Sequence, residues 1–232
     1  MPFFIFDNPF RKFLIALAKS DGKLFALLNR VKVGEALGLE IVNELIESNI
    51  IYMVNSREKP FKVYNKQLIK KEYKNYTIEP KIYFTKPFFR FWFLFVEPYR
   101  DRGINIDMLL DNIKSREYLL SSLVFEQLSI ELLKSNFNNI VEISSYWDIN
   151  SEFDIYAKLS NKEFILGECK YKNKPINRAE LIKLKYKAVT SNLRVDRYAL
   201  FSKSGFSNEL KKLNSNDLLL YELEDFKRLI DI

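Results

Sequence analysis

Two stretches, Phe153-Asp154-Ile155-Tyr156-Ala157 and Phe164-Ile165-Leu166-Gly167-Glu168-Cys169-Lys170, decide the fold of the C-terminal half of this 232-residue chain. Both are rich in apolar and aromatic residues that favour β-strands. The polar residues Ser160-Asn161-Lys162 stand between them and indicate a tight turn. The sequence therefore predicts an antiparallel hairpin with strands at 153–159 and 163–171.

The residues around this hairpin predict an α/β (α+β) domain over residues 118–232. Apolar residues recur at helical spacing on both sides of it, and short apolar runs between these segments are typical of strands. The expected flanking elements are helices at 117–135, 177–191, 208–212 and 222–230 and strands at 140–144 and 198–201.

The N-terminal part of the chain predicts a winged helix-turn-helix domain over residues 1–66. The expected elements are helices at 11–19, 23–29 and 39–48 and strands at 50–54 and 61–64. In many such folds the third helix reads DNA. Here that helix and its approach carry four carboxylates, at Glu35, Glu40, Glu44 and Glu47. Because carboxylates repel phosphates, we expect this helix to act as a scaffold or to contact protein.

Residues 67–117 are expected to connect the two domains. The segment 81–98 reads Lys-Ile-Tyr-Phe-Thr-Lys-Pro-Phe-Phe-Arg-Phe-Trp-Phe-Leu-Phe-Val-Glu-Pro. Such a density of aromatic residues is rarely left exposed to water. We expect an extended piece and a helix wedged between the domains. The alternative is a platform on which nucleobases stack.

The hairpin also brings together side chains that could form a reactive site, because residues two apart on a strand share one face. Glu168 and Lys170 therefore project together, and antiparallel pairing brings Asp154 beside Glu168. Two carboxylates suit a divalent cation, with the Cys169 carbonyl as a third ligand and Lys170 placed to position or activate a water molecule. Glu126 interrupts the inward apolar stripe of the helix at 117–135 and is expected to join the site. The alternative interpretation of Glu168 and Lys170 is a surface ion pair.

Composition narrows the chemistry further. The chain has no histidine and a single cysteine, Cys169, whose side chain we expect to fill the core. This excludes histidine-based triads and most zinc sites, so the expected cofactor is Mg or Mn. The sequence has no phosphate-binding loop and hence no ATP site of its own. It also has no signal peptide and no membrane-spanning segment, which favours a cytoplasmic protein that binds no membrane.

The formal net charge is +7, with a pI of about 9.2, which favours a polyanionic partner such as nucleic acid. A lysine-rich composition bias is the alternative explanation. We expect Lys183 and Tyr186 to face the site. The expected nucleic-acid-binding residues are Lys172, Lys174, Arg178, Lys183, Lys185, Arg57 and Lys59. Their alternative role is a solvated surface.

The chain resembles the DUF234 family, the C-terminal region of archaeal-type AAA+ ATPases, over residues 80–210. The resemblance lies in Tyr-Phe-Thr-Lys-Pro-Phe-Phe-Arg-Phe-Trp-Phe at 83–93, Phe-Asp-Ile-Tyr-Ala at 153–157, Leu-Gly-Glu-Cys-Lys-Tyr at 166–171 and Leu-Phe-Ser-Lys-Ser-Gly-Phe at 200–206. It implies a PD-(D/E)XK restriction-endonuclease-like domain. In that pattern Asp154 and Glu168 hold the metal, Lys170 is the catalytic lysine and Glu126 is the helix glutamate. Family members usually carry an ATPase domain, so we expect this chain to stand alone or to work with a separate ATPase.

Three functions follow as hypotheses. The first is a Mg-dependent endonuclease or exonuclease that hydrolyses DNA phosphodiester bonds. The second is a non-catalytic nucleic-acid-binding or regulatory module. The third is an interaction protein, either a partner of a separate AAA+ ATPase or a homodimer.

Overall fold

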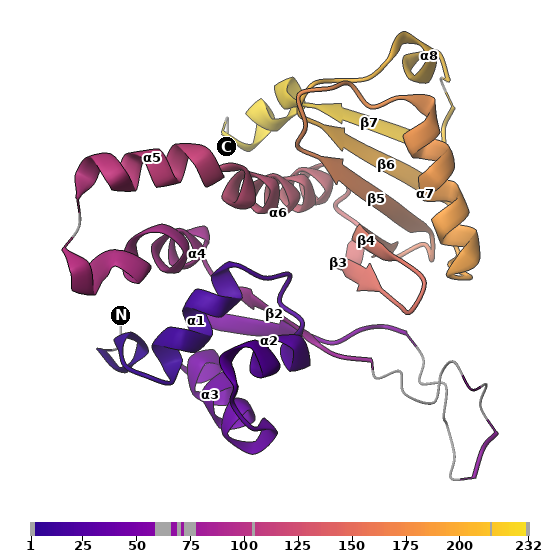
Figure 1. Ribbon diagram of the computed structural model, residues 1–232. Coiled ribbons are helices and arrows are strands. Elements are labelled where there is room, and N and C mark those ends of the chain that lie inside the picture. The colour runs from indigo at the N-terminus through magenta and orange to yellow at the C-terminus, as the bar shows by residue number, and fades with distance from the viewer. Residues whose placement is uncertain are drawn as a thin grey trace. The chain divides into compact units, whose positions relative to one another are not determined.

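The computed structural model describes residues 3–58, 66–68, 71, 78–103, 105–213 and 215–230. Contacts divide the chain into two compact units, with the boundary in sequence between Leu120 and Ser121. The first unit holds Met1–Ser56 and Pro60–Leu120, and the second holds Arg57–Lys59 and Ser121–Ile232. The overall class is mixed α and β, as expected from the sequence (Figure 1).

Three helices and a two-stranded ribbon begin the first unit. They are the helices α1 (Phe10–Ala18), α2 (Leu24–Val31) and α3 (Glu35–Glu47), preceded by the 3-10 turn η1 (Phe3–Phe6), and the strands β1 (Ile51–Val54) and β2 (Lys81–Phe84). β1 pairs antiparallel with β2, from Ile51↔Phe84 to Val54↔Lys81. The expected strand at 61–64 lies outside the described residues. The described partner of β1 thus comes from the aromatic stretch.

Glycine allows β2 to approach the turn between α1 and α2. Gly22 has a φ of 83°, and a Cβ atom there would lie 2.3 Å from the Ile82 carbonyl oxygen. The Ile82 N–H in turn donates to the Gly22 carbonyl oxygen at 2.8 Å. Any other residue would push the strand away from the helices.

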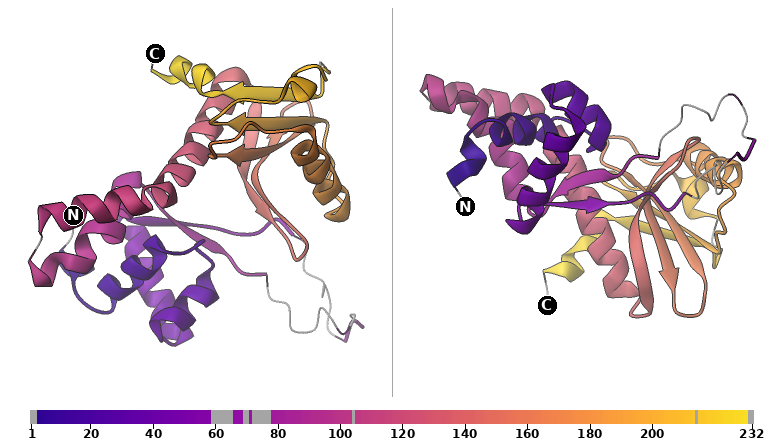
Figure 2. Two further views of the ribbon diagram at one scale, coloured as in Figure 1. Left: turned by 45° about the horizontal axis from the view of Figure 1, so that its top comes forward. Right: turned by 90° about the horizontal axis from the view of Figure 1, so that it is seen from below.

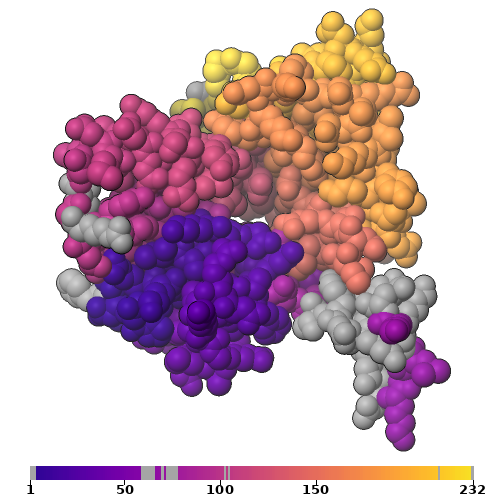
Figure 3. Space-filling view, viewed as in Figure 1, coloured from indigo at the N-terminus to yellow at the C-terminus, as the bar shows by residue number. Residues whose placement is uncertain are grey.

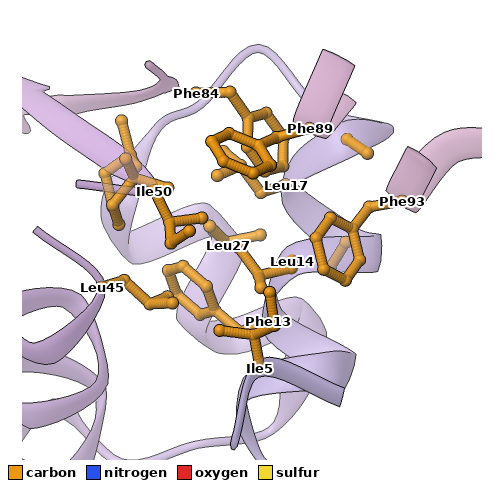
Figure 4. Packing of buried hydrophobic residues seen from close by; sticks show 14 of the residues in the cluster. Ile5, Phe13, Leu14, Leu17, Leu27, Leu45, Ile50, Phe84, Phe89 and Phe93 are labelled. Carbon is orange, nitrogen blue, oxygen red and sulfur yellow. The ribbon is translucent and has the colours of Figure 1, made fainter. Parts of the chain in front are cut away.

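The aromatic stretch after β2 belongs to the core of the first unit. It forms α4 (Pro87–Phe91), the π-helical turn η3 (Trp92–Val96), the 3-10 turn η4 (Glu97–Arg102) and then α5 (Ile106–Arg116). Phe89 and Phe93 pack against Phe13, Leu14 and Leu17 of α1, as Figure 4 shows. Rings buried in this way present no free face to a nucleobase, whereas Phe88 of the same stretch is 53% exposed.

The second unit is built on a five-stranded mixed sheet. Its strands are β3 (Ile140–Trp147), β4 (Glu152–Leu159), β5 (Phe164–Lys170), β6 (Arg197–Ser202) and β7 (Leu218–Glu222), and they neighbour one another in this order. β3, β4 and β5 form an antiparallel meander, whereas β5, β6 and β7 are parallel. The parallel pairs need crossovers, which α7 (Arg178–Thr190) and α8 (Asn208–Lys211) supply.

Helices cover both faces of this sheet (Figures 1 and 2). On one face, α6 (Tyr118–Asn136) and the 3-10 turn η5 (Leu223–Leu229) pack on the sheet through Phe125, Leu132 and Phe226. On the other face, α7 and α8 pack through Leu181, Leu184 and Leu210. In Figure 3, the outer side of α7 forms part of the orange surface. Among the described residues, no helix is both long and apolar enough to cross a membrane.

Candidate metal and phosphodiester site

The site lies where β4 and β5 separate. Their ladder runs from Lys158↔Phe164 to Ile155↔Gly167 and ends there. β5 continues beside β6 as far as Lys170, which pairs with Ser202. The segment of β5 from Glu168 to Lys170 is therefore held on one side by β6, and on the other side it faces Asp154.

A β-bulge in β4 aims Asp154 at this segment. Between the pairs Ser144↔Tyr156 and Tyr146↔Phe153, β4 contains one residue more than β3. Asp154 lies in this interval, and its Oδ2 accepts a hydrogen bond of 2.7 Å from the backbone N–H of Cys169. The carboxylate thus stands in for the backbone acceptor of β4 that a continued β4–β5 ladder would have supplied. Bulges of this kind re-aim a side chain at a functional site.

Glu168 stands between two lysines. Lys170 Nζ donates to Glu168 Oε1, and Lys187 Nζ from α7 lies 3.6 Å from Glu168 Oε2. The side chains of Glu168, Lys170 and Lys187 are 16%, 21% and 25% exposed, so the group is shielded from bulk water. Within the described part of the chain, Glu168 Oε2 is buried and accepts no hydrogen bond. A buried carboxylate oxygen left in this way is a candidate cation ligand.

The electrostatics of the site reflect two carboxylates held close together. Burial, followed by the charge of Glu168, raises the pKa of Asp154 to about 6. The Cys169 N–H, Lys170 and Lys187 act in the opposite direction. Burial lowers the pKa of Lys170, but the Glu168 carboxylate outweighs it, and the pKa ends above its usual value. Lys170 is therefore an ammonium group at neutral pH.

These residues fit a hard divalent cation. Asp154 and Glu168 supply the carboxylates, and Glu168 Oε2 is the orphaned acceptor. In the described ranges, no three His, Cys, Asp or Glu side chains gather as a metal-binding group. Mg²⁺ binds through one or two carboxylates and keeps several water molecules, so a larger group is not required for it. The backbone carbonyl of Cys169 remains the expected further ligand.

Replacement of Asp154 by asparagine is expected to stabilise the protein at pH 7.5 in EDTA. Because the pKa of Asp154 is about 6 in the folded protein and lower in the unfolded chain, folding takes up a proton between pH 4 and pH 6. The stability that the protonated Asp154 contributes is therefore fully present below pH 4 and is lost as the pH rises through 6. Asp154→Asn removes this penalty, which is about 1–3 kcal/mol at pH 7.5. Urea unfolding of wild type and Asp154→Asn at pH 4 and at pH 7.5 measures the difference in their free energies of unfolding. A gain that is absent at pH 7.5, or larger at pH 4, contradicts it.

Cys169 and Glu126 lie on the opposite side of β5. Cys169 packs against the cluster beneath α6, and burial, followed by the charge of Asp154, raises the pKa of its thiol well above the usual value. A hydrogen bond with Ser129 of α6 acts in the opposite direction, and the charge of Glu126 adds to the rise. The structure therefore places the half-buried Glu126 near the Cys169 thiol. The cysteine side chain is directed away from the carboxylates, as expected from strand alternation.

The expected nucleic-acid-binding residues fall into two groups. Arg178 pairs with Glu209 at 3.2 Å, Lys185 pairs with Asp217 at 3.7 Å, and Arg57 pairs with Glu142 at 3.1 Å. By contrast, three of them are exposed and have no ion pair to any described residue: Lys172, Lys174 and Lys183. Lys59 lies outside the described residues.

Sequence reasoning missed Lys187 as a member of the site. Lys183 and Tyr186, which were expected to face the site, are exposed, Tyr186 by 69%, and the α7 side chain that contacts Glu168 is Lys187. Lys187 follows the buried Leu184 by three residues, which puts it on the inward side of the helix. That spacing is the signal in the sequence that identifies it.

A loop after β6 fixes the segment that follows Lys170. The backbone N–H of Lys203 donates to the Lys170 carbonyl oxygen at 3.1 Å, and Ser204 Oγ donates to the Lys172 carbonyl oxygen at 2.8 Å. Gly205 turns the loop with a φ of 75°, and its carbonyl oxygen accepts from Ser202 Oγ at 2.7 Å. The motif Phe-Ser-Lys-Ser-Gly-Phe at 201–206 thus supports the end of β5.

Comparison with known families finds a match to part of the chain. Residues 92–187 match the family model of DUF234, described as archaea bacterial proteins of unknown function. No curated protein matches the chain. Among solved structures, it is similar to a chain in the refined half-complex from the tetradecameric assembly of Thermococcus gammatolerans McrB AAA+ hexamers with bound McrC.

That likeness is distant. The two chains are 11% identical, and the match covers 97% of this chain but 52% of the other, with a TM-score of 0.31. This chain therefore spans about half the length of the one it matches, and a TM-score of this size supports no inference about fold or function. The family match confirms the resemblance to DUF234 stated from the sequence, over residues 92–187.

Proposed function

We propose that the second unit is a metal-dependent nuclease of the PD-(D/E)XK kind that hydrolyses phosphodiester bonds in DNA. The observation that carries the proposal is the meeting of Asp154, Glu168 and Lys170 at the divergence of β4 and β5, with Glu168 Oε2 buried and without a hydrogen bond to any described residue. A divalent cation bound there supplies Lewis-acid polarisation of the phosphate and a more acidic water molecule.

Each residue has a role that follows from its contacts. Asp154 and Glu168 hold the cation, and the Cys169 N–H fixes the Asp154 carboxylate in place. Lys170 is an ammonium group, so it donates a hydrogen bond to the attacking water or to a phosphate oxygen and offsets the charge that develops there. Glu126 of α6 lies near the Cys169 thiol, on the other side of β5, and is given no part in holding the cation.

The test is a cleavage assay of the purified chain on supercoiled plasmid, linear duplex and single-stranded DNA. We expect cutting with Mg²⁺ or Mn²⁺ and none in EDTA. Products from circular plasmid indicate an endonuclease, whereas cutting of linear substrates alone indicates an exonuclease. Failure to cut any of these substrates with either metal contradicts the proposed function.

DNA is proposed to bind through the three lysines without ion pairs, Lys172, Lys174 and Lys183. Their combined replacement by alanine is expected to weaken DNA binding and to lower the slope of log affinity against log salt by about 2–3, since each phosphate contact contributes about 0.9. Arg178→Ala and Lys185→Ala are matched controls, because these residues already have carboxylate partners. Fluorescence anisotropy over a range of salt concentrations measures the slope. An unchanged slope in the triple variant places the DNA elsewhere.

A second role is proposed for the first unit. The exposed side of α3 carries Glu40 and Glu44 beside Leu37 and Leu39, and α3 has no basic residue. An acidic surface with exposed leucines suits a basic protein surface better than DNA. The proposed partner is a separate AAA+ ATPase, as the family resemblance implies. Co-purification with such an ATPase that survives Glu40→Lys with Glu44→Lys argues against this role of α3.

A further inference from the structure

Lys187 is held at three points beside the two carboxylates. Its Nζ atom donates to the Glu152 carbonyl oxygen at 2.7 Å, lies 4.9 Å from the centre of the Phe153 ring and lies 3.6 Å from Glu168 Oε2. The first two contacts come from β4, immediately before Asp154. An ammonium group fixed in this way is positioned by the fold and is not a loose surface charge.

The oxygen that Lys187 faces is the one a cation needs. Lys170 already donates to Glu168 Oε1, so Oε2 is the acceptor left for a metal. A divalent cation bound to Glu168 Oε2 and Asp154 would repel an ammonium group less than 4 Å from the same oxygen, because like charges at that separation in a shielded site interact strongly.

We propose that Lys187 is a positioning residue that substitutes for the cation: it neutralises Glu168 when no metal is bound and must leave Glu168 Oε2 when the metal enters. This inference rests on the metal site of the proposed function. Lys187 is expected to weaken metal binding and to stabilise the metal-free protein. Lys170 differs, because it lies on the other oxygen of Glu168 and remains paired with the metal in place.

The experiment compares wild type with Lys187→Met, which keeps the length of the side chain over Phe153 but removes its charge. Titration calorimetry with Mn²⁺ alone is expected to give a dissociation constant about tenfold lower for Lys187→Met, since the cation no longer displaces an ammonium group. Lys185→Met is the matched control on the same helix. Lys185 pairs with Asp217 at 3.7 Å and not with Asp154 or Glu168, so its replacement is expected to leave the affinity unchanged.

Thermal unfolding separates this role from a merely structural one. In EDTA, Lys187→Met is expected to unfold at a lower temperature than wild type, because two buried carboxylates lose a compensating charge. In saturating Mn²⁺ the difference is expected to vanish or to reverse. A structural role of the contact with Glu152 would lower the unfolding temperature equally in both conditions, and that result overturns the proposal.

The outcomes also separate this inference from the proposed nuclease. Tighter Mn²⁺ binding by Lys187→Met without DNA cleavage by any variant supports the role of Lys187 and contradicts the nuclease. Equal or weaker Mn²⁺ binding by Lys187→Met overturns the role of Lys187, whether or not the wild type cuts DNA. Absence of Mn²⁺ binding in both proteins overturns it as well.

Discussion

Glu168→Ala and Lys170→Ala are each expected to reduce the rate of metal-dependent DNA cleavage by a factor of about a thousand or more. Glu168 supplies one of the two carboxylates, and loss of the cation removes several kcal/mol of transition-state stabilisation, where about 4 kcal/mol corresponds to this factor. Lys170 donates to Glu168 Oε1 and is an ammonium group, so its loss removes the positive charge that is proposed to stabilise the transition state beside the metal. Single-turnover cleavage of a labelled duplex in Mn²⁺ measures both rates.

Two matched variants show whether such losses belong to the site. Glu163→Ala removes a carboxylate from the same hairpin, where it pairs with Arg197 at 3.0 Å. Lys211→Ala removes a lysine that pairs with Glu222 at 2.8 Å in the same unit. Both are expected to cut within a few-fold of wild type. Loss of cleavage in these controls, or wild-type rates in Glu168→Ala, contradicts the assignment.

Glu97→Ala is expected to destabilise the first unit by about 3–5 kcal/mol, the usual cost of removing one partner of a buried ion pair. The Glu97 side chain is fully buried, and its Oε1 accepts from Arg11 Nε at 2.7 Å. Its Oε2 accepts from Trp92 Nε1 at 3.0 Å, and its backbone carbonyl oxygen accepts from Arg11 Nη2 at 3.0 Å. The variant leaves the Arg11 Nε–H and the Trp92 indole N–H without their acceptors. Urea unfolding followed by tryptophan fluorescence measures the loss.

Asp101 provides the control for this prediction. It pairs with the same Arg11, but its side chain is 63% exposed. Asp101→Asn is therefore expected to cost less than about 1 kcal/mol, as exposed ion pairs do. Similar losses of stability in Glu97→Ala and Asp101→Asn would show that burial does not decide how much each Arg11 ion pair contributes. Retention of wild-type stability by Glu97→Ala would show that the aromatic stretch packs without it.

Local pattern was enough to predict the centre of the second unit. The hairpin of β4 and β5 follows from two apolar runs around a polar turn, and the shared face of Glu168 and Lys170 follows from strand alternation. The helices α6 and α7 follow from apolar spacing. These features depend on residues near one another in sequence.

Features set by distant residues were not predicted. The bulge at Asp154 depends on the pairing of β4 with β3, and no local sequence pattern in β4 predicts it. β7 was missed because Leu218-Leu219-Leu220-Tyr221 is a short apolar run that fits a helix or a strand equally well. The pairing of β1 with β2 crosses a long sequence interval, so it also escaped prediction. Lys187 reaches Glu168 only once α7 packs on the sheet.

Titration calorimetry with Mn²⁺ on three proteins tests most directly whether Asp154 and Glu168 together hold a divalent cation. Saturable binding to wild type is expected at pH 7.5, and both Asp154→Asn and Glu168→Gln are expected to lose it. Binding of equal strength in all three proteins, or no binding to wild type, would contradict this expectation.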